Sequence, residues 1–136
     1  QFAISTKDPG LFLGYYKDTT AEETARILKE FYQLDKVELV HDPTVAQIKA
    51  AVASGKLVLV PAAGRQLPNP NYRTPGPLYH MLVIKGYTKD GKLITNDPGT
   101  RKGADYIYDP KVIMNAMHDW NDGDVEQGQK VIIIVG

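Results

Sequence analysis

Two short apolar segments separated by a polar turn place the strongest constraint on the fold of this chain. Residues 79–87 contain the continuous apolar run Met81–Ile84, residues 92–96 contain Leu93 and Ile94, and residues 88–91 between them are polar or glycine. Apolar segments of this length on either side of a short polar turn predict two antiparallel strands joined as a hairpin. His80 stands near the start of the first strand and Asp97 directly after the second. The hairpin therefore brings together two side chains that can carry chemistry.

The remaining elements follow from capping signals and apolar periodicity. The sequence Thr20-Ala21-Glu22-Glu23 is a capping box, which predicts a helix from Thr20. A second helix is expected to start at Asp42 as its cap, with Pro43 in the first turn, and to stop at Gly55. Further strands are expected at Val37–Val40, Leu57–Val60, Ala104–Tyr108 and Val131–Val135. Helices followed mostly by hairpin-connected strands predict an α+β fold, with helices packed on an antiparallel sheet.

A third helix is expected after Asp109-Pro110, with its apolar residues facing inward. This face would include Ile113, Ala116, Met117 and Trp120. His118 would then lie on the last turn, where a cation is mildly favoured by the helix dipole.

Residues 64–77 contain four prolines and two glycines, so they can form neither a helix nor an interior strand. Loops of this length inside a compact domain often serve as lids or binding loops. A surface excursion stiffened by proline is the alternative. Both interpretations remain open at this point.

The register of the hairpin decides whether His80 and Asp97 can meet. With a four-residue loop, Tyr87 pairs with Lys92. Leu82 then faces Asp97, and His80 becomes a diagonal neighbour of Asp97 on the same face, roughly 7–8 Å away between backbones. A tighter two-residue turn would leave the two side chains further apart.

Such a pair supports acid–base chemistry. The aspartate would fix the tautomer of the imidazole and stabilise its cation, and the histidine could withdraw a proton from a nucleophile and later return it. The alternative is a histidine that a neighbouring carboxylate merely satisfies within a sheet. Sequence geometry alone leaves both open.

Composition narrows the function classes. The chain has 136 residues, 43% of them hydrophobic, and 16 basic residues balance 16 acidic ones. A neutral chain without a basic stripe gives no indication of nucleic-acid binding. There is no cysteine, which excludes disulfides and thiolate metal ligands, and no histidine pair has metal-ligand spacing, so we expect no metal and no cofactor. The longest apolar run, 131–135, is far too short to cross a membrane.

The histidine segment Tyr79-His80-Met81-Leu82-Val83-Ile84-Lys85-Gly86-Tyr87, followed by Ile94-Thr95-Asn96-Asp97-Pro98-Gly99-Thr100, resembles bacterial papain-like cysteine peptidases. The likeness is to the bacteriocin-processing (double-glycine leader) peptidases and their broader relatives, and it covers most of the chain. It implies a papain-like α+β fold in which a sheet supplies the histidine and the aspartate. By that resemblance His80 matches the general base and Asp97 its orienting carboxylate. Tyr79 would offer backbone groups to an extended peptide substrate.

The resemblance leaves the nucleophile unmatched. In such peptidases a cysteine stands at the start of an N-terminal helix, after an oxyanion glutamine, and this chain has no cysteine. Because the chain opens at Gln1 with an internal-looking start, we expect residues 1–136 to be a single, truncated domain whose nucleophile helix is missing. Loss of the nucleophile in this lineage is the alternative. Apolar residues between Phe2 and Tyr16 would pack on the chain's own core or on that missing segment.

Three hypotheses on function follow. The chain is the histidine/aspartate portion of a cysteine peptidase-like domain, inactive by itself, which hydrolyses peptide bonds through a thiolate and an acyl-enzyme when the Cys segment is present. Alternatively it is a non-catalytic peptide-binding module, or a degenerate domain in which the pair only holds the hairpin. The expected partners are a peptide or protein substrate and the domain's own missing segment. A place at the cell envelope or outside the cell is implied by the resemblance alone.

Overall fold

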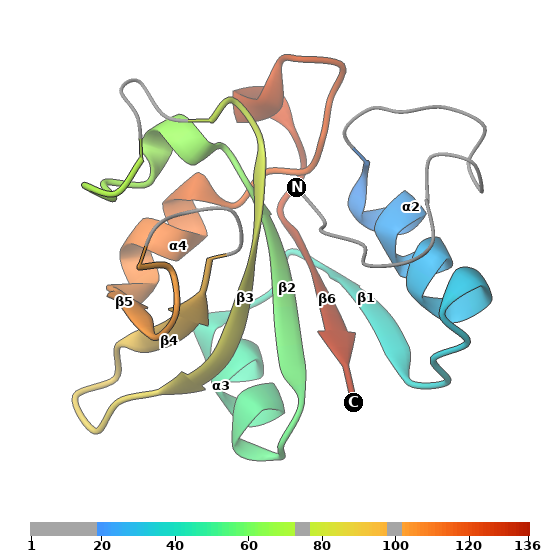
Figure 1. The fold of residues 1–136 in the computed structure, drawn as a ribbon, viewed down its shortest axis with the longest axis horizontal. Helices are drawn as coiled ribbons and strands as arrows, with labels where there is room; N and C mark the ends of the chain where they lie inside the picture. The colour runs from blue at the N-terminus through green and yellow to red at the C-terminus, as the bar shows by residue number, and fades with distance from the viewer. Residues whose placement is uncertain (1–18, 73–76, 98–101) are drawn as a thin grey trace.

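The computed structural model of the chain describes residues 19–72, 77–97 and 102–136, which form one antiparallel sheet with helices on both faces (Figure 1). The strand order is β1-β6-β2-β3-β4-β5. This arrangement confirms the expected α+β class with helices packed on an antiparallel sheet. The apolar residues between Phe2 and Tyr16 lie outside the described residues. The strands are β1 Val37–His41, β2 Leu57–Ala62, β3 His80–Tyr87, β4 Leu93–Asn96, β5 Tyr106–Tyr108 and β6 Val131–Val135.

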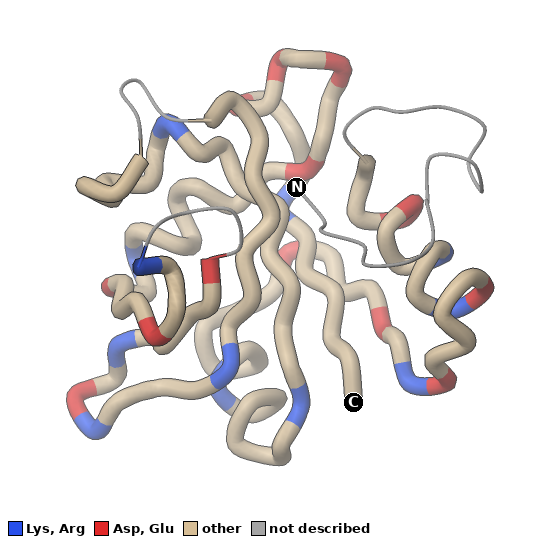
Figure 2. The backbone as a smooth tube through the Cα atoms, viewed as in Figure 1, with Lys and Arg blue, Asp and Glu red and all other residues tan. Residues whose placement is uncertain are grey.

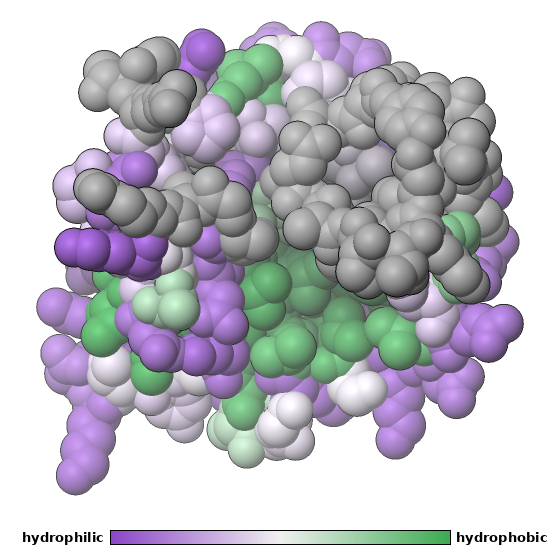
Figure 3. Space-filling view, viewed as in Figure 1, coloured by the Kyte–Doolittle hydropathy of each residue, from purple (hydrophilic) through white to green (hydrophobic). Residues whose placement is uncertain are grey.

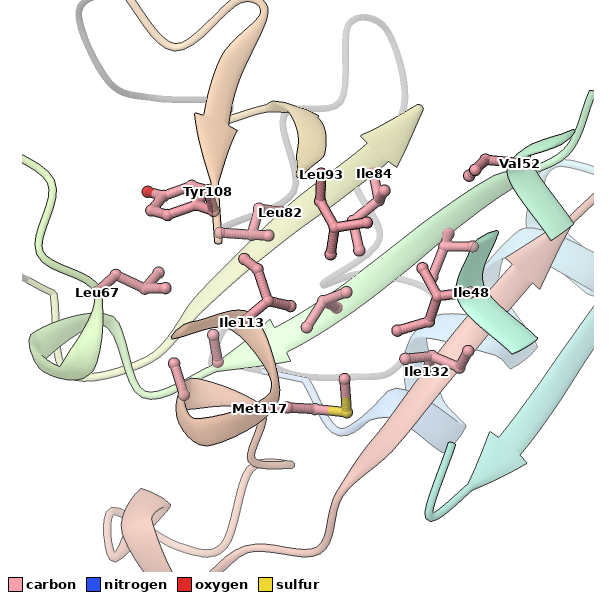
Figure 4. Close-up of a cluster of buried hydrophobic side chains, with 14 of the residues drawn as sticks. Ile48, Val52, Leu67, Leu82, Ile84, Leu93, Tyr108, Ile113, Met117 and Ile132 are labelled. Atoms are coloured by element: carbon pink, nitrogen blue, oxygen red, sulfur yellow. The ribbon is translucent and has the colours of Figure 1, made fainter. Parts of the chain in front are cut away.

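Two apolar clusters lie on opposite faces of the sheet, because successive side chains of a strand alternate between faces. One cluster joins α2 to the sheet and contains Leu28, Leu59, Met81 and Ile133. The other is larger and joins α3 and α4 to the sheet (Figure 4). Its fully buried members include Ile48, Val58, Val60, Leu82, Ile84, Ile113, Met117 and Ile132.

The helices are short. Helix α2, Ala21–Arg26, continues into a π-helical turn, η1 Ile27–Phe31, and the capping box at Thr20 is present as expected. The other helical segments are α3 Val45–Ala53, α4 Pro110–Ala116 and the 3₁₀ turns η2 Gly64–Gln66 and η3 Val125–Gln127. Among the described residues, none of these helices has the length and hydropathy required to span a membrane.

The start of α3 differs from the prediction. The cap is Thr44, whose hydroxyl accepts from the N–H of Gln47 while the Gln47 side chain accepts from Thr44. Asp42 cannot play this role because its φ is +49° and its N–H donates to the carbonyl of Lys130 at 2.9 Å. A residue held in the left-handed region and bonded to a neighbouring segment ends a strand and does not begin a helix.

The end of α4 also differs from the prediction. The helix stops at Ala116, and the N–H of His118 donates to the carbonyl of Pro61 at 3.0 Å. Met117 forms an isolated bridge with Ala62 at the end of β2. Pairing with β2 therefore takes the chain out of the helix before His118 and Trp120, which were expected on its last turns.

Charged residues are dispersed over the visible part of the chain and do not gather into a single stripe (Figure 2). Apolar side chains do gather on one face, between β3 and α2 (Figure 3). Partly buried residues of the α2 cluster on the strands, among them Leu39, Val83 and Val135, belong to this side of the sheet. The absence of a basic stripe in this view agrees with the neutral composition.

Candidate active site

The hairpin of β3 and β4 places His80 and Asp97 on the same face, as expected, but by another route. Tyr87 pairs with Leu93, not with Lys92, so the loop has five residues. A bulge between Ile84 and Gly86 then shifts the register by one residue, and Ile84 pairs with Thr95. The two departures offset each other, since a bulge inserts one extra residue into one strand. The register beyond the bulge is the one that makes His80 a diagonal neighbour of Asp97.

His80 and Asp97 are in direct contact, through Nε2 of the imidazole and Oδ1 of the carboxylate. Both side chains are buried: His80 is 7% exposed and Asp97 is 3% exposed. The backbone N–H of Asp97 donates to the carbonyl of Gly103 at 2.9 Å, which holds the end of β4 in place. The buried carboxylate itself has the imidazole of His80 as a partner, and it requires one because an unpaired charge is costly inside a protein.

The contact determines which nitrogen of the imidazole is available for chemistry. With Nε2 directed at the carboxylate, Nε2 carries the proton and Nδ1 holds the free lone pair when the ring is neutral. Among the described residues the structure gives Nδ1 no hydrogen-bond partner. The pair can therefore act as an oriented base, with Nδ1 as its reactive atom.

Tyr72 also contacts the carboxylate, and the sequence analysis missed it. Its hydroxyl donates to Oδ2 of Asp97, the oxygen that His80 does not use. Its ring packs edge-on against the imidazole of His80, with centroids 5.6 Å apart. Burial, followed by the bond to Asp97, raises the pKa of the Tyr72 phenol, which keeps it a donor. The only sequence signal was that Tyr72 belongs to the long proline-rich loop.

Two further side chains stand behind Tyr72. Tyr108, on β5, is buried in the apolar cluster against which Tyr72 packs. Nδ2 of Asn69 donates to the Tyr108 hydroxyl at 2.9 Å, and Oδ1 of Asn69 accepts from the N–H of Asn71 at 2.9 Å. Burial also raises the pKa of Tyr108. No local pattern in the sequence connects these residues, which come from the loop and from a strand formed later in the chain.

Tyr79, the expected substrate contact, lies beside the pair. Its hydroxyl donates to the carbonyl of Thr19 at 2.7 Å, and its ring meets that of Trp120 edge-on, with centroids 5.3 Å apart. Trp120 thus packs on Tyr79 and not on the inward face of α4, where it was predicted. The binding role predicted for Tyr79 concerned its backbone, and it stays a prediction.

The other histidines have local roles. Nδ1 of His118 lies 3.0 Å from the carbonyl oxygen of Gly128, and His41 is exposed at the end of β1. Within residues 19–72, 77–97 and 102–136 no three His, Asp or Glu side chains are grouped so that they could hold a metal ion. The pair of His80 and Asp97 therefore remains the candidate site in the described part of the chain.

Comparisons with known proteins identify the family and the fold. The model of the Peptidase_C39 like family matches residues 10–123. The crystal structure of a protein from Bacillus anthracis, described as a C39-like peptidase, superposes with a TM-score of 0.58 at 14% sequence identity. The superposition covers 86% of this chain but 59% of that one, so this chain spans less than two thirds of the length of that neighbour. No curated protein matches.

Proposed function

The chain belongs to the Peptidase_C39 like family, and on that premise we propose that it carries the base and orienting residues of a cysteine peptidase site. His80 is the general base and acid, and Asp97 holds its tautomer. The nucleophile is a thiolate that these 136 residues do not contain, because they include no cysteine. The chain by itself is therefore inactive in peptide-bond cleavage, and activity requires a segment that supplies the thiol.

One observation carries the proposal: the Nε2–Oδ1 contact between His80 and Asp97 across adjacent strands. It leaves Nδ1 to accept the proton of a thiol. The thiolate sulfur would then bond to the carbonyl carbon of a peptide, and His80 would return the proton to the nitrogen of the departing amine as the C–N bond breaks. Water, deprotonated by the same nitrogen, would hydrolyse the acyl-enzyme.

The substrate proposed for this site is a peptide or protein segment in extended form. Tyr79 directly precedes β3, and its backbone lies next to the histidine in the chain. An extended peptide can use such backbone groups as it would those of a sheet edge. The packing of the Tyr79 ring on Trp120 supports this assignment by holding that stretch of backbone in place.

The direct test is a peptidase assay of the complete gene product, with a panel of unstructured peptides. We expect His80→Ala to lower kcat/KM on the order of 10²–10⁴-fold, the range that a positioned acid–base group supplies. Asp97→Asn should give a smaller loss through kcat. His41→Ala, at an exposed histidine of β1, is the matched control and should leave the rate unchanged. Equal activity of His80→Ala and the parent would refute the proposal.

A non-catalytic peptide-binding module is the second candidate. The observation that favours it is the low exposure of His80 and Asp97 together with the lack of any cysteine. In that case the complete gene product binds extended peptides, cleaves none of them, and binds equally well with His80→Ala. Measuring binding by calorimetry beside the cleavage assay separates the two functions.

A further inference from the structure

The carboxylate of Asp97 ends a line of hydrogen-bonding side chains that the family resemblance did not anticipate. Asn69 donates to the hydroxyl of Tyr108, Tyr72 packs against the apolar cluster that contains Tyr108, and Tyr72 donates to Asp97. Asn69, Tyr108 and Asp97 are buried, with exposed fractions of 7%, 4% and 3%. A buried network of this kind is costly unless every member finds a partner, and a satisfied one rigidifies its surroundings.

The direction of the line is set at its far end. The side-chain oxygen of Asn69 accepts from the N–H of Asn71, so its amide nitrogen must be the group that faces Tyr108. Tyr108 thus accepts from Asn69. The hydroxyl of Tyr72 donates its proton to Oδ2 of Asp97. Tyr72 is therefore the member of the set that acts directly on the carboxylate.

We propose that Asn69, Tyr108 and Tyr72 form a relay of contacts that locks the carboxylate of Asp97 in the orientation in which it accepts the Nε2 proton of His80. Hydrogen bonds join Asn69 to Tyr108 and Tyr72 to Asp97, and the two tyrosines pack in one apolar cluster between them. Tyr72 is then a positioning residue for the site, acting on His80 through Asp97. The catalytic meaning of this role rests on the proposed function, whereas the effect on the imidazole does not.

The chemistry of the relay suits this task. A carboxylate has two oxygens, and Tyr72 occupies the one that His80 leaves free, which restricts rotation of the group about its last side-chain bond. Burial raises the pKa of both phenols, so they remain neutral donors and do not compete with His80 for the proton. The edge-on packing of the Tyr72 ring on His80 restrains the second partner at the same time.

The relay also assigns a role to the described part of the proline-rich loop. Residues 67–72 are folded by backbone hydrogen bonds of their own. The N–H of Asn69 donates to the carbonyl of Leu67 at 2.8 Å, and the N–H of Tyr72 donates to the carbonyl of Asn69 at 3.1 Å. These turns present Asn69 and Tyr72 to the two ends of the relay. This stretch of the loop therefore acts as a brace for the site, a role distinct from the lid or binding loop considered from the sequence.

The experiment is nuclear magnetic resonance of the 136-residue chain with ¹⁵N-labelled histidine, in the parent and in Tyr72→Phe. In the parent we expect the neutral imidazole of His80 as the Nε2–H tautomer, with a slowly exchanging Nε2 proton. Removing the Tyr72 hydroxyl should speed exchange of that proton with water about tenfold, as expected for the loss of one ordering hydrogen bond, and should populate the Nδ1–H tautomer. Tyr108→Phe should act in the same direction with a smaller effect.

Tyr106→Phe is the matched control, because Tyr106 packs against Tyr108 on the same strand at a centroid distance of 4.8 Å while its hydroxyl takes no part in the relay. It should leave the signals of His80 unchanged. An Nδ1–H tautomer in the parent, or identical His80 signals in the parent, Tyr72→Phe and Tyr108→Phe, would overturn the relay. If Tyr72→Phe perturbs His80 while the complete gene product cleaves no peptide, the relay stands and the proposed function fails.

Discussion

The carboxylate of Asp119 accepts a hydrogen bond from the backbone N–H of Ala21 at 2.8 Å, across 98 residues of sequence. Ala21 is the first residue of α2, and its N–H is one of the amide groups that a helix cannot satisfy internally. The same oxygen accepts from the N–H of Trp120 at 2.8 Å. One side chain thus ties the start of α2 to the segment that follows α4.

Replacing Asp119 should test this tie. Asp119→Ala is expected to lower the free energy of unfolding by about 1–2 kcal/mol, because two backbone donors lose their acceptor. Asp119→Asn keeps an oxygen in place and should cost less. Urea unfolding followed by circular dichroism measures both, with Glu126→Ala, an exposed carboxylate nearby, as the control. Equal losses for Asp119→Ala and Glu126→Ala would contradict the assigned role.

The same residue predicts a pH dependence of stability. Burial raises the pKa of Asp119 above its ordinary value of 3.8, despite the two N–H donors. The folded state therefore holds the proton more tightly than the unfolded state, and the associated stabilisation is present below pH 3.8 and lost as pH rises through the folded pKa. The unfolding free energy of the parent relative to Asp119→Asn should fall with rising pH across this window. A difference that is flat or rises would refute the assignment.

Lys130 should stabilise the end of α4. Its Nζ donates to the carbonyls of Met114 at 2.6 Å and Met117 at 3.1 Å, where a helix has unpaired acceptors. Lys130→Met keeps the apolar stem and removes the donors, so we expect a loss of about 1–2 kcal/mol in the free energy of unfolding. Lys89→Met, in the exposed hairpin loop, is the control for loss of a charge. Thermal melts in which both variants match the parent would exclude this role.

Close packing around Gly128 predicts a strong effect of a single methyl group. A Cβ at this position would stand 2.0 Å from the backbone oxygen of Asp119, so the backbone must shift. Gly128→Ala should lower the free energy of unfolding by about 1–3 kcal/mol, the usual cost of overpacking. At Gly86 the nearest atom to such a Cβ is Cδ1 of Ile94 at 3.7 Å, which makes Gly86→Ala the matched comparison. Two variants of equal stability would count against the packing described here.

Local signals in the sequence were sufficient for much of the fold. Short apolar runs between turn residues predicted the strands, and Thr20 and Gly55 marked a helix start and a helix stop correctly. The start of α3 was predicted two residues too early, because Asp42 and Thr44 both carry side chains suited to a cap. Only the bond between Asp42 and the carbonyl of Lys130 decides between them, and that bond belongs to the tertiary structure.

The hairpin shows how a correct result can rest on compensating errors. The predicted loop was one residue too short, and the bulge at β3 adds the residue that restores the register. Had the bulge been absent, Asp97 would lie opposite Val83 and point to the other face of the sheet, away from His80. The pairing of these two side chains therefore depends on a bulge that the alternation of apolar residues does not reveal.

By itself the sequence determined the class of fold and the hairpin, because these depend on short apolar segments and on the turn between them, and it singled out His80 and Asp97 as two side chains that could meet. The tertiary structure alone decided the place of β6 between β1 and β2, the end of α4, and the convergence of Asn69, Tyr72 and Tyr108 on Asp97. Contacts between segments far apart in the chain leave no local pattern. They arise only when burial and hydrogen bonding are satisfied over the whole molecule at once.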